Sequence, residues 1–293
     1  MNRRGVVERA NIKILDGGYE EEGGGFMEFM QVAFFAPLNQ YEAAGMFTIP
    51  HLVALLSCSL ILIGGLWFSF HYLVEEHVIK VTRGIAWLVA VLELIKMIYK
   101  FYYGYTAIDS WLPLSFCSLF IYATFMSGYG QGRVKKIGDA FILMGGAVGG
   151  ISFLLMPTTS LMSYPIWHFL SVHSLLFHVL MIYLNGLYLR YYADQLTLKT
   201  YKYFSFYFLG AALLSLTLNG YYGANLMIIQ KPLRIPIECV QSLYHAQPYL
   251  YTCLAIASYL MAPALFAAMA KFFFTHRQLS EETTNQPQEY SHL

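Results

Sequence analysis

Long apolar stretches alternate with short polar connections over most of this chain. A membrane-spanning α-helix needs about 20 mainly apolar residues, and about seven stretches approach that length. We therefore predict an all-α, polytopic membrane helical bundle of about seven transmembrane helices. The expected spans cover approximately residues 50–73, 84–105, 111–128, 137–156, 166–189, 203–220 and 247–274.

Polar segments flank the predicted bundle on both sides. Residues 1–25 are charged and glycine-rich and contain no apolar core, so they are expected to form a disordered polar leader and not a signal peptide. Residues 26–45 mix apolar and polar positions and predict an interfacial segment. The transmembrane domain is then residues 46–275, and residues 276–293 form a polar tail.

The basic residues of the loops and tail predict an orientation. Cytoplasmic loops carry an excess of Lys and Arg, and here ten such residues fall on one side against four on the other. The richer side comprises Lys80, Arg83, Arg133, Lys135, Lys136, Arg190, Lys199, Lys202, Lys271 and Arg277. The N-terminus is therefore expected outside and the C-terminus in the cytoplasm, in a multi-pass protein of the cell membrane.

Composition supports a membrane protein and excludes several other classes. Hydrophobic residues make up 57% of the chain and charged residues 12%, where soluble proteins average about 25% charged. A net charge of +1 provides no basic surface for nucleic acid. The four cysteines show no C-x-x-C spacing, so we expect no metal site and no redox pair. No cofactor motif is visible, and membrane lipids are the expected partners; a homo-oligomer or a membrane partner protein stays open.

Unusual polar residues gather toward one end of the predicted spans. They are His51, Glu93, Lys96, Ser115, Cys117, His173, Asn219 and Asn225. At 1.5 Å per residue, His173 lies about 10 Å below the outer surface of the bilayer. We predict that His51, Glu93, Cys117, His173 and Asn219 line one cavity in the outer half of the bundle. Ionisable residues within spans are functional candidates, although Glu93 and Lys96, three residues apart, also suit a purely structural ion pair.

Three histidines lie in the fifth predicted span, which begins "WHFLSVHSLLFHVL". His168 is expected at the interface, where water satisfies its ring. His173 and His178 are five residues apart and point about 140° from each other on a helix, which disfavours a shared metal. We predict that His173 carries function and that His168 and His178 are structural.

Four stretches together resemble the YwaF-type integral membrane proteins of bacteria, over about residues 47–265. They are "FTIPHLVALL", "LPLSFCSLF", "FLSVHSLLFHVLMIYL" and "LNGYYGANLMIIQKP". The distant animal relatives, transmembrane protein 164 among them, are phospholipid acyltransferases that use a cysteine and a histidine. The resemblance maps that histidine onto His173. The animal cysteine directly follows a proline, and Leu114 stands there; the family histidine two after the proline is Ser115, and the bacterial cysteine is retained as Cys117.

The resemblance implies an outward-facing lipid acyltransferase. Acyl transfer requires a nucleophile, a base within hydrogen-bond reach and donors for the developing oxyanion. His173 is the candidate base, Cys117 or Ser115 the candidate nucleophile, and Asn219 or Asn225 would orient the acyl carbonyl. Two other functions remain open. A small-solute transporter would line its path with Glu93, Lys96 and the histidines, and a non-catalytic scaffold or receptor-like module would use the same groups for helix packing.

Overall fold

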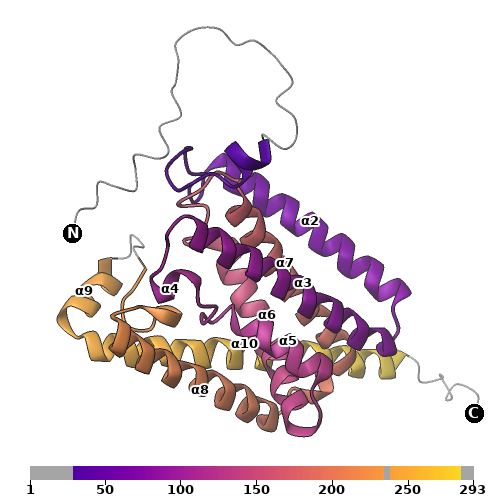
Figure 1. Cartoon of the computed structure of the whole chain (residues 1–293). Helices are drawn as coiled ribbons and strands as arrows, with labels where there is room; N and C mark the ends of the chain where they lie inside the picture. Colours follow the sequence, from indigo (N-terminus) through magenta and orange to yellow (C-terminus); the bar gives the residue numbers. More distant parts are fainter. Residues whose placement is uncertain (1–28, 234–237, 285–293) are drawn as a thin grey trace, which may run out of the picture.

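The computed structural model describes residues 29–233 and 238–284, and every regular element in these ranges is helical (Figure 1). The long helices are α2 (Ile49–Tyr72), α3 (Glu75–Tyr102), α6 (Gly132–Leu155), α7 (Phe169–Tyr192), α8 (Leu198–Tyr222) and α10 (Pro248–Thr284). The shorter elements are η2 (Phe29–Phe34), α4 (Ile108–Trp111), α5 (Leu119–Tyr129), η3 (Ala193–Gln195), η4 (Leu226–Ile228) and α9 (Glu238–Ala246). The predicted leader, residues 1–25, lies outside the described residues.

Five helices of the described chain are long and apolar enough to cross a membrane. They are α2, α6, α7, α8 and the first 27 residues of α10. Helix α3 has 28 residues and so exceeds the length of a span, but Glu93, Lys96 and Lys100 lie in its second half. The fold is therefore an all-α membrane bundle, with α3 set apart from the five apolar helices by its charges.

The third predicted span, residues 111–128, is not one continuous helix. Helix α4 ends at Trp111, residues 112–118 contain no long helix, and α5 has only 11 residues. Pro113 explains the break, because proline lacks the N–H that an α-helix needs and disfavours helical geometry at the residue before it. At 1.5 Å per residue α5 is about 17 Å long, roughly half of a hydrocarbon core.

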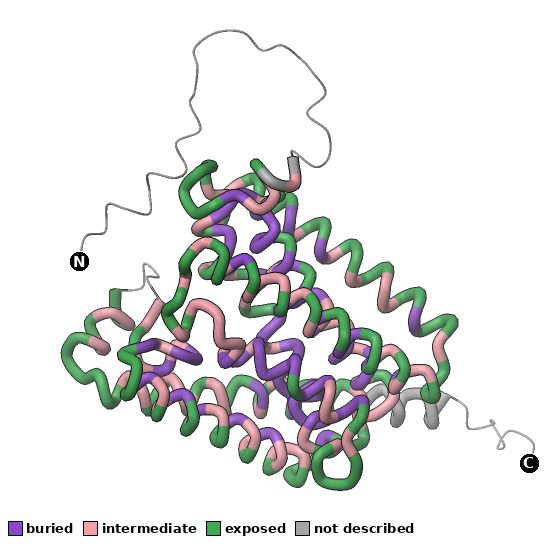
Figure 2. The backbone as a smooth tube through the Cα atoms, in the orientation of Figure 1, coloured by how far each residue is buried: buried purple, intermediate pink, exposed green. Residues whose placement is uncertain are grey.

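Helices α6 and α7 form the centre of the bundle, and α2 and α10 its periphery (Figure 2). In the most apolar stretch, 67% of the residues are buried in α6 and 61% in α7, against 17% in both α2 and α10. Large apolar side chains such as Leu52, Leu56, Leu60 and Ile63 are exposed along α2. Exposed apolar side chains on a long apolar helix suit contact with lipid tails, which are themselves apolar.

Helix α6 packs against α5 at a distance that only glycine permits. A Cβ atom added to Gly138 would lie 2.5 Å from the carbonyl oxygen of Ala123 and 2.5 Å from the backbone nitrogen of Ser127. Both obstacles are backbone atoms, so no side-chain rotation relieves the clash. Small residues at helix interfaces have this effect in membrane bundles, where close van der Waals packing drives association.

A glycine also permits the close approach of α6 and α7. A Cβ at Gly146 would lie 3.1 Å from the carbonyl oxygen of Met181 and 3.1 Å from Cβ of Asn185. The close approach allows the Asn185 amide to donate hydrogen bonds to the carbonyl oxygens of Ile142 and Leu143, each at 2.9 Å. Asn185 is buried, so both amide protons are satisfied in an environment without water.

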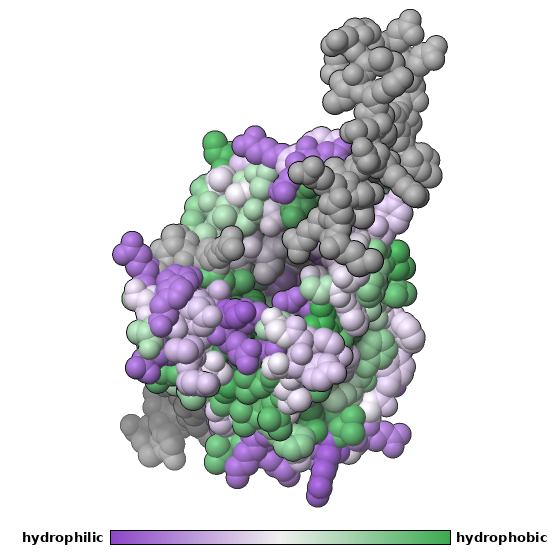
Figure 3. Space-filling view, turned by 60° about the vertical axis from the view of Figure 1, so that its left-hand side comes forward, coloured by the Kyte–Doolittle hydropathy of each residue, from purple (hydrophilic) through white to green (hydrophobic). Residues whose placement is uncertain are grey.

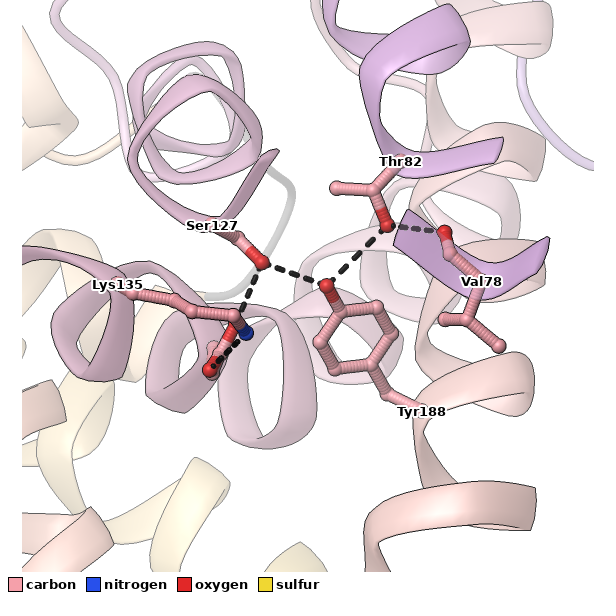
Figure 4. A network of polar contacts seen from close by, with 6 residues as sticks. Val78, Thr82, Ser127, Lys135 and Tyr188 are labelled. Carbon is pink, nitrogen blue, oxygen red and sulfur yellow. Dashed lines mark hydrogen bonds and ion pairs between the residues drawn. The ribbon is translucent and has the colours of Figure 1, made fainter. Parts of the chain in front are cut away.

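A buried polar network joins α3, α5, α6 and α7 at the end where α3 begins (Figure 4). Ser127 donates to Oδ1 of Asp139 at 2.5 Å, so the hydroxyl of Tyr188, 2.5 Å from Ser127 Oγ, donates to Ser127. Thr82 Oγ1 lies 3.2 Å from the Tyr188 hydroxyl, and Lys135 pairs with Asp139 Oδ2 at 2.7 Å. Every buried polar side chain of this network therefore has a partner, as a structural network requires.

The segment before α2 packs on the opposite end of the bundle. Tyr99 donates to the carbonyl oxygen of Ala36 at 2.6 Å, and Nε2 of His168 donates to the same oxygen at 2.9 Å. Tyr103 donates to the carbonyl oxygen of Phe35 at 2.6 Å. Two hydroxyls and one imidazole thus hold this segment, part of the predicted interfacial stretch 26–45, against α3 and α7.

The helix contact at Gly138 generates a testable prediction. Gly138→Ala should lower the free energy of unfolding by about 1–3 kcal/mol, because the added methyl group displaces two backbones in a close-packed core. Gly210→Ala in α8 is the matched control: nothing lies within 4 Å of its added Cβ, so the gain in helix propensity should leave stability equal or higher. Unfolding of the purified variants in mixed micelles measures both. Equal stability of the two variants would contradict the close contact.

Candidate functional site

A cavity of about 440 Å³ lies between α3, α6, α7 and α10. Residues 115–118, the loop after α6 (Met156, Thr158 and Thr159) and the loop after α8 supply the rest of its wall. Its surface is mainly apolar, with a few polar side chains converging on it, as in many ligand sites. Figure 3 shows the face on which α9 comes forward, where hydrophilic and apolar side chains both border a hollow near the middle.

Glu93, Lys96 and His173 form one cluster of ionisable side chains in the cavity wall. Nζ of Lys96 lies 2.5 Å from Oε1 of Glu93, and Nε2 of His173 lies 3.5 Å from Oε2 of the same carboxylate. The Glu93 and His173 side chains are each 5% exposed, while that of Lys96 is 23% exposed. The Lys96 pair is the close ion pair that the spacing predicted. The contact between Glu93 and His173 is a finding of the structure.

This arrangement suits His173 to proton transfer. A carboxylate beside one imidazole nitrogen orients the ring and stabilises the imidazolium that forms when the other nitrogen takes a proton. Oε2 of Glu93 lies 3.5 Å from Nε2, an ion-pair contact and not a hydrogen bond, which leaves Nδ1 as the nitrogen away from the carboxylate. Nδ1 is buried and has no hydrogen-bond partner among the residues that the structure describes.

Cys117 shares the cavity with His173 but makes no hydrogen bond to it in the described chain. Its Sγ lies 3.9 Å from the carbonyl oxygen of Gly149 on α6. Ser115 also lines the cavity, and its Oγ lies 2.8 Å from Oγ of Ser118 while accepting from the Ser118 backbone N–H at 3.1 Å. Of the two candidate nucleophiles, Ser115 is thus engaged in closing the turn before α5, and Cys117 is held only by one weak thiol contact.

His178 also lines the cavity, together with His173. Its ring stacks on Phe153 of α6, with centroids 3.7 Å apart and planes 7° from parallel. His178 does point to another helix than His173, as the 140° between them predicts. That direction predicts a structural role alone for His178, but the cavity extends to its ring as well.

His51 and His168 do not line the cavity, and the backbone satisfies both rings. Nδ1 of His51 accepts from the Phe47 N–H at 3.0 Å, so Nε2 carries the proton and donates to the Leu154 carbonyl at 2.9 Å. His168 is the N-cap of α7, accepting from the Leu170 N–H while Nε2 donates to the segment before α2. His168 is fully buried, not solvated at the interface as expected.

Asn219 and Asn225 shape the loop that closes the cavity and are not among its lining residues. The Asn219 side chain accepts from the Leu226 N–H at 2.7 Å and donates to the Leu226 carbonyl at 3.1 Å. Asn225 accepts from the Lys231 N–H at 3.0 Å and donates to its carbonyl at 2.8 Å. Each amide therefore hydrogen-bonds to the main chain of the loop, so in this conformation neither amide is positioned to orient a substrate carbonyl as predicted.

Two cavity residues of this loop have left-handed backbone angles. Met227 and Ile228 have φ of 57° and 58°, which is costly for side chains with a Cβ and most of all for a β-branched one. Hydrogen bonds hold Met227 in place. The Met227 N–H donates to the Leu114 carbonyl oxygen at 3.2 Å, and the Tyr259 hydroxyl donates to the Met227 carbonyl oxygen at 3.2 Å. The loop thus joins the 112–118 segment to α10 across the cavity.

Comparison with known proteins places this architecture in a family. The chain matches no curated protein and no solved structure. The model of the TMEM164 family matches residues 46–274, which include all the helices around the cavity and the three residues Glu93, Cys117 and His173. The match covers most of the 293 residues and nearly coincides with the transmembrane domain expected from the sequence. The chain therefore belongs to the TMEM164 family.

Proposed function

We propose that this protein transfers acyl chains between membrane lipids, with His173 as the general base and Cys117 as the nucleophile. The observation that carries the proposal is the contact of Glu93 with His173 in the wall of an apolar cavity that also holds a free thiol. A carboxylate-oriented histidine next to a nucleophile is the usual arrangement for acyl transfer. The apolar wall provides room for an acyl chain.

In the first step, His173 takes the thiol proton of Cys117, and the sulfur attacks the ester carbonyl of a donor phospholipid. The tetrahedral intermediate collapses, the C–O bond breaks, and the leaving lysolipid oxygen takes the proton from His173. The thioester remains on Cys117. In the second step an acceptor lipid hydroxyl attacks the thioester carbonyl, the C–S bond breaks, and the hydroxyl proton passes to the sulfur, which restores the thiol. This sequence requires rotation of the Cys117 side chain away from Gly149 toward the ester, because no hydrogen bond holds the thiol on His173.

Lys96 supplies a reason for phospholipid as the substrate. Its ammonium group lies in the cavity wall and keeps part of its surface accessible, although it pairs with Glu93. A lipid phosphate is an anion of the kind that lysine binds. Lys96 lies three residues from Glu93 on α3, and Glu93 contacts His173. A phosphate at Lys96 would therefore place the glycerol esters of the lipid close to His173.

We further propose that the five apolar helices span the membrane together with α3 and the 112–129 segment, which gives seven spans. The charged residues of α3 that lie deep in the bundle face the cavity and not lipid, so they do not prevent α3 from spanning. Gly132 at the start of α6 would then lie on the cytoplasmic side, and Tyr249 at the start of α10 on the outer side. The excess of Lys and Arg in the loops on the Gly132 side supports this orientation.

Cysteine labelling tests the topology. In a background without the native cysteines, Tyr249→Cys should react with a membrane-impermeant maleimide on intact cells, and Gln131→Cys only after permeabilisation. Both sites are exposed in the structure. The reverse pattern would overturn the orientation, and labelling of both sites from one side would overturn the number of spans.

Acyl transfer itself is tested with purified protein, a phospholipid labelled in one acyl chain and an unlabelled lysophospholipid. His173→Ala should lower the rate by about 10²- to 10⁴-fold, the usual contribution of a general base. Glu93→Gln should lower it less, because the ring stays but loses the carboxylate that orients it. Cys117→Ala should abolish both transfer and the labelled thioester on the protein.

His71→Ala is the matched control, since His71 is an exposed histidine on α2 outside the cavity. Its rate should equal that of the wild type, and thermal unfolding should show that every variant is folded. Full activity in His173→Ala would refute the proposal. Full activity in Cys117→Ala alone would remove the covalent intermediate.

A further inference from the structure

Two kinds of histidine occur on α2 and at or within α7. His51 and His168 lie outside it, and each uses both ring nitrogens in hydrogen bonds to the backbone. His178 lies in the cavity wall and uses only one, because its Nε2 is buried and has no partner in the part of the chain that the structure describes. The rings of His51 and His168 therefore serve the fold, whereas the ring of His178 has one nitrogen available for a ligand.

The protonation of His178 follows from its contacts. Nδ1 lies 2.6 Å from the carbonyl oxygen of Ser174, four residues earlier on α7. A carbonyl oxygen only accepts, so Nδ1 carries the proton and Nε2 of the neutral ring presents a lone pair. The stack on Phe153 restrains rotation of the ring, and the residue is only 7% exposed. Position and tautomer are thus both fixed before any ligand arrives.

The unpaired Nε2 of His178 requires a hydrogen-bond donor. A buried acceptor without a hydrogen bond destabilises a fold, and the described side chains provide no donor for this one. The ligand that satisfies it must bring an O–H or N–H group into a mainly apolar cavity. A lysolipid fits both requirements, because it combines one free hydroxyl with an apolar chain.

We propose that Nε2 of His178 binds the hydroxyl group of the lipid that accepts the acyl chain. This inference rests on the proposed acyl transfer and adds a second base to it. The hydroxyl proton passes to Nε2 as the oxygen forms the new ester bond, the C–S bond of the thioester breaks, and the proton is returned to the sulfur of Cys117. His173 serves the donor lipid and His178 the acceptor.

The geometry of α7 supports this division. His173 faces Glu93 on α3, while His178 faces Phe153 on α6. Five residues separate them, which corresponds to about 7.5 Å along the helix axis and about 140° around it. Both rings line the same cavity, one beside α3 and the other beside α6, so two lipids could each meet a different histidine there.

Binding measurements test His178 independently of turnover. The probes are oleoyl lysophosphatidylcholine and its deoxy analogue, which lacks only the free hydroxyl. The wild type should bind the hydroxyl lipid about fivefold to tenfold more tightly, the usual effect of one hydrogen bond. His178→Phe retains an aromatic ring for the stack and should bind both lipids equally. His178→Gln places an amide oxygen near the position of Nε2 and should recover part of the difference.

His71→Phe is the matched control, because Nδ1 of His71 makes the same bond to the carbonyl four residues earlier, on Trp67, but outside the cavity. Its preference for the hydroxyl lipid should equal that of the wild type. A preference that persists in folded His178→Phe would overturn the inference while leaving acyl transfer intact. If acyl transfer is absent in the wild type but the preference is present and lost in His178→Phe, the proposed reaction fails and the hydroxyl site stands.

Discussion

The close approach of α6 and α7 determines where the cavity groups on these two helices lie relative to each other. Glycine at 146 brings the two backbones together, and the Asn185 amide then ties α7 to two carbonyl oxygens of α6. These bonds fix both the rotation and the axial position of α7. His173 and His178 lie on the same helix, so the Asn185 contact sets the direction of both rings from about two turns away for His178 and more than three turns away for His173.

The two ends of the bundle differ in how their polar groups are satisfied. Around Tyr188, each hydroxyl and carboxylate has a partner, and the network joins four helices. Around His173 and His178, about 15 to 22 Å away along α7, three ring nitrogens are without hydrogen bonds among the described residues. The satisfied end stabilises the fold, and the end with unpaired ring nitrogens is the one that can bind a ligand.

The sequence predicted the helical membrane bundle, because runs of about 20 apolar residues leave few alternatives in lipid. It also brought Glu93, Cys117 and His173 to one depth, and the structure places all three in one cavity wall. It could not predict the partner of His173, since the rotation of α3 relative to α7 depends on packing. Proline breaks helices, but Pro113 lies within an apolar run, and the length of that run predicted a single span across it.

Asn219 and Asn225 show a second limit. Their amides suggested oxyanion donors, but each is used by the main chain of the loop after α8, and no sequence pattern distinguishes the two uses. That loop and the 112–118 segment meet through the Met227 N–H and the Leu114 carbonyl. Because this joint is made of main-chain atoms, substitutions of the side chains around it leave it in place. Substitutions of the wall side chains can therefore change the shape of the cavity, and with it the ligand that fits, while the frame of the pocket persists.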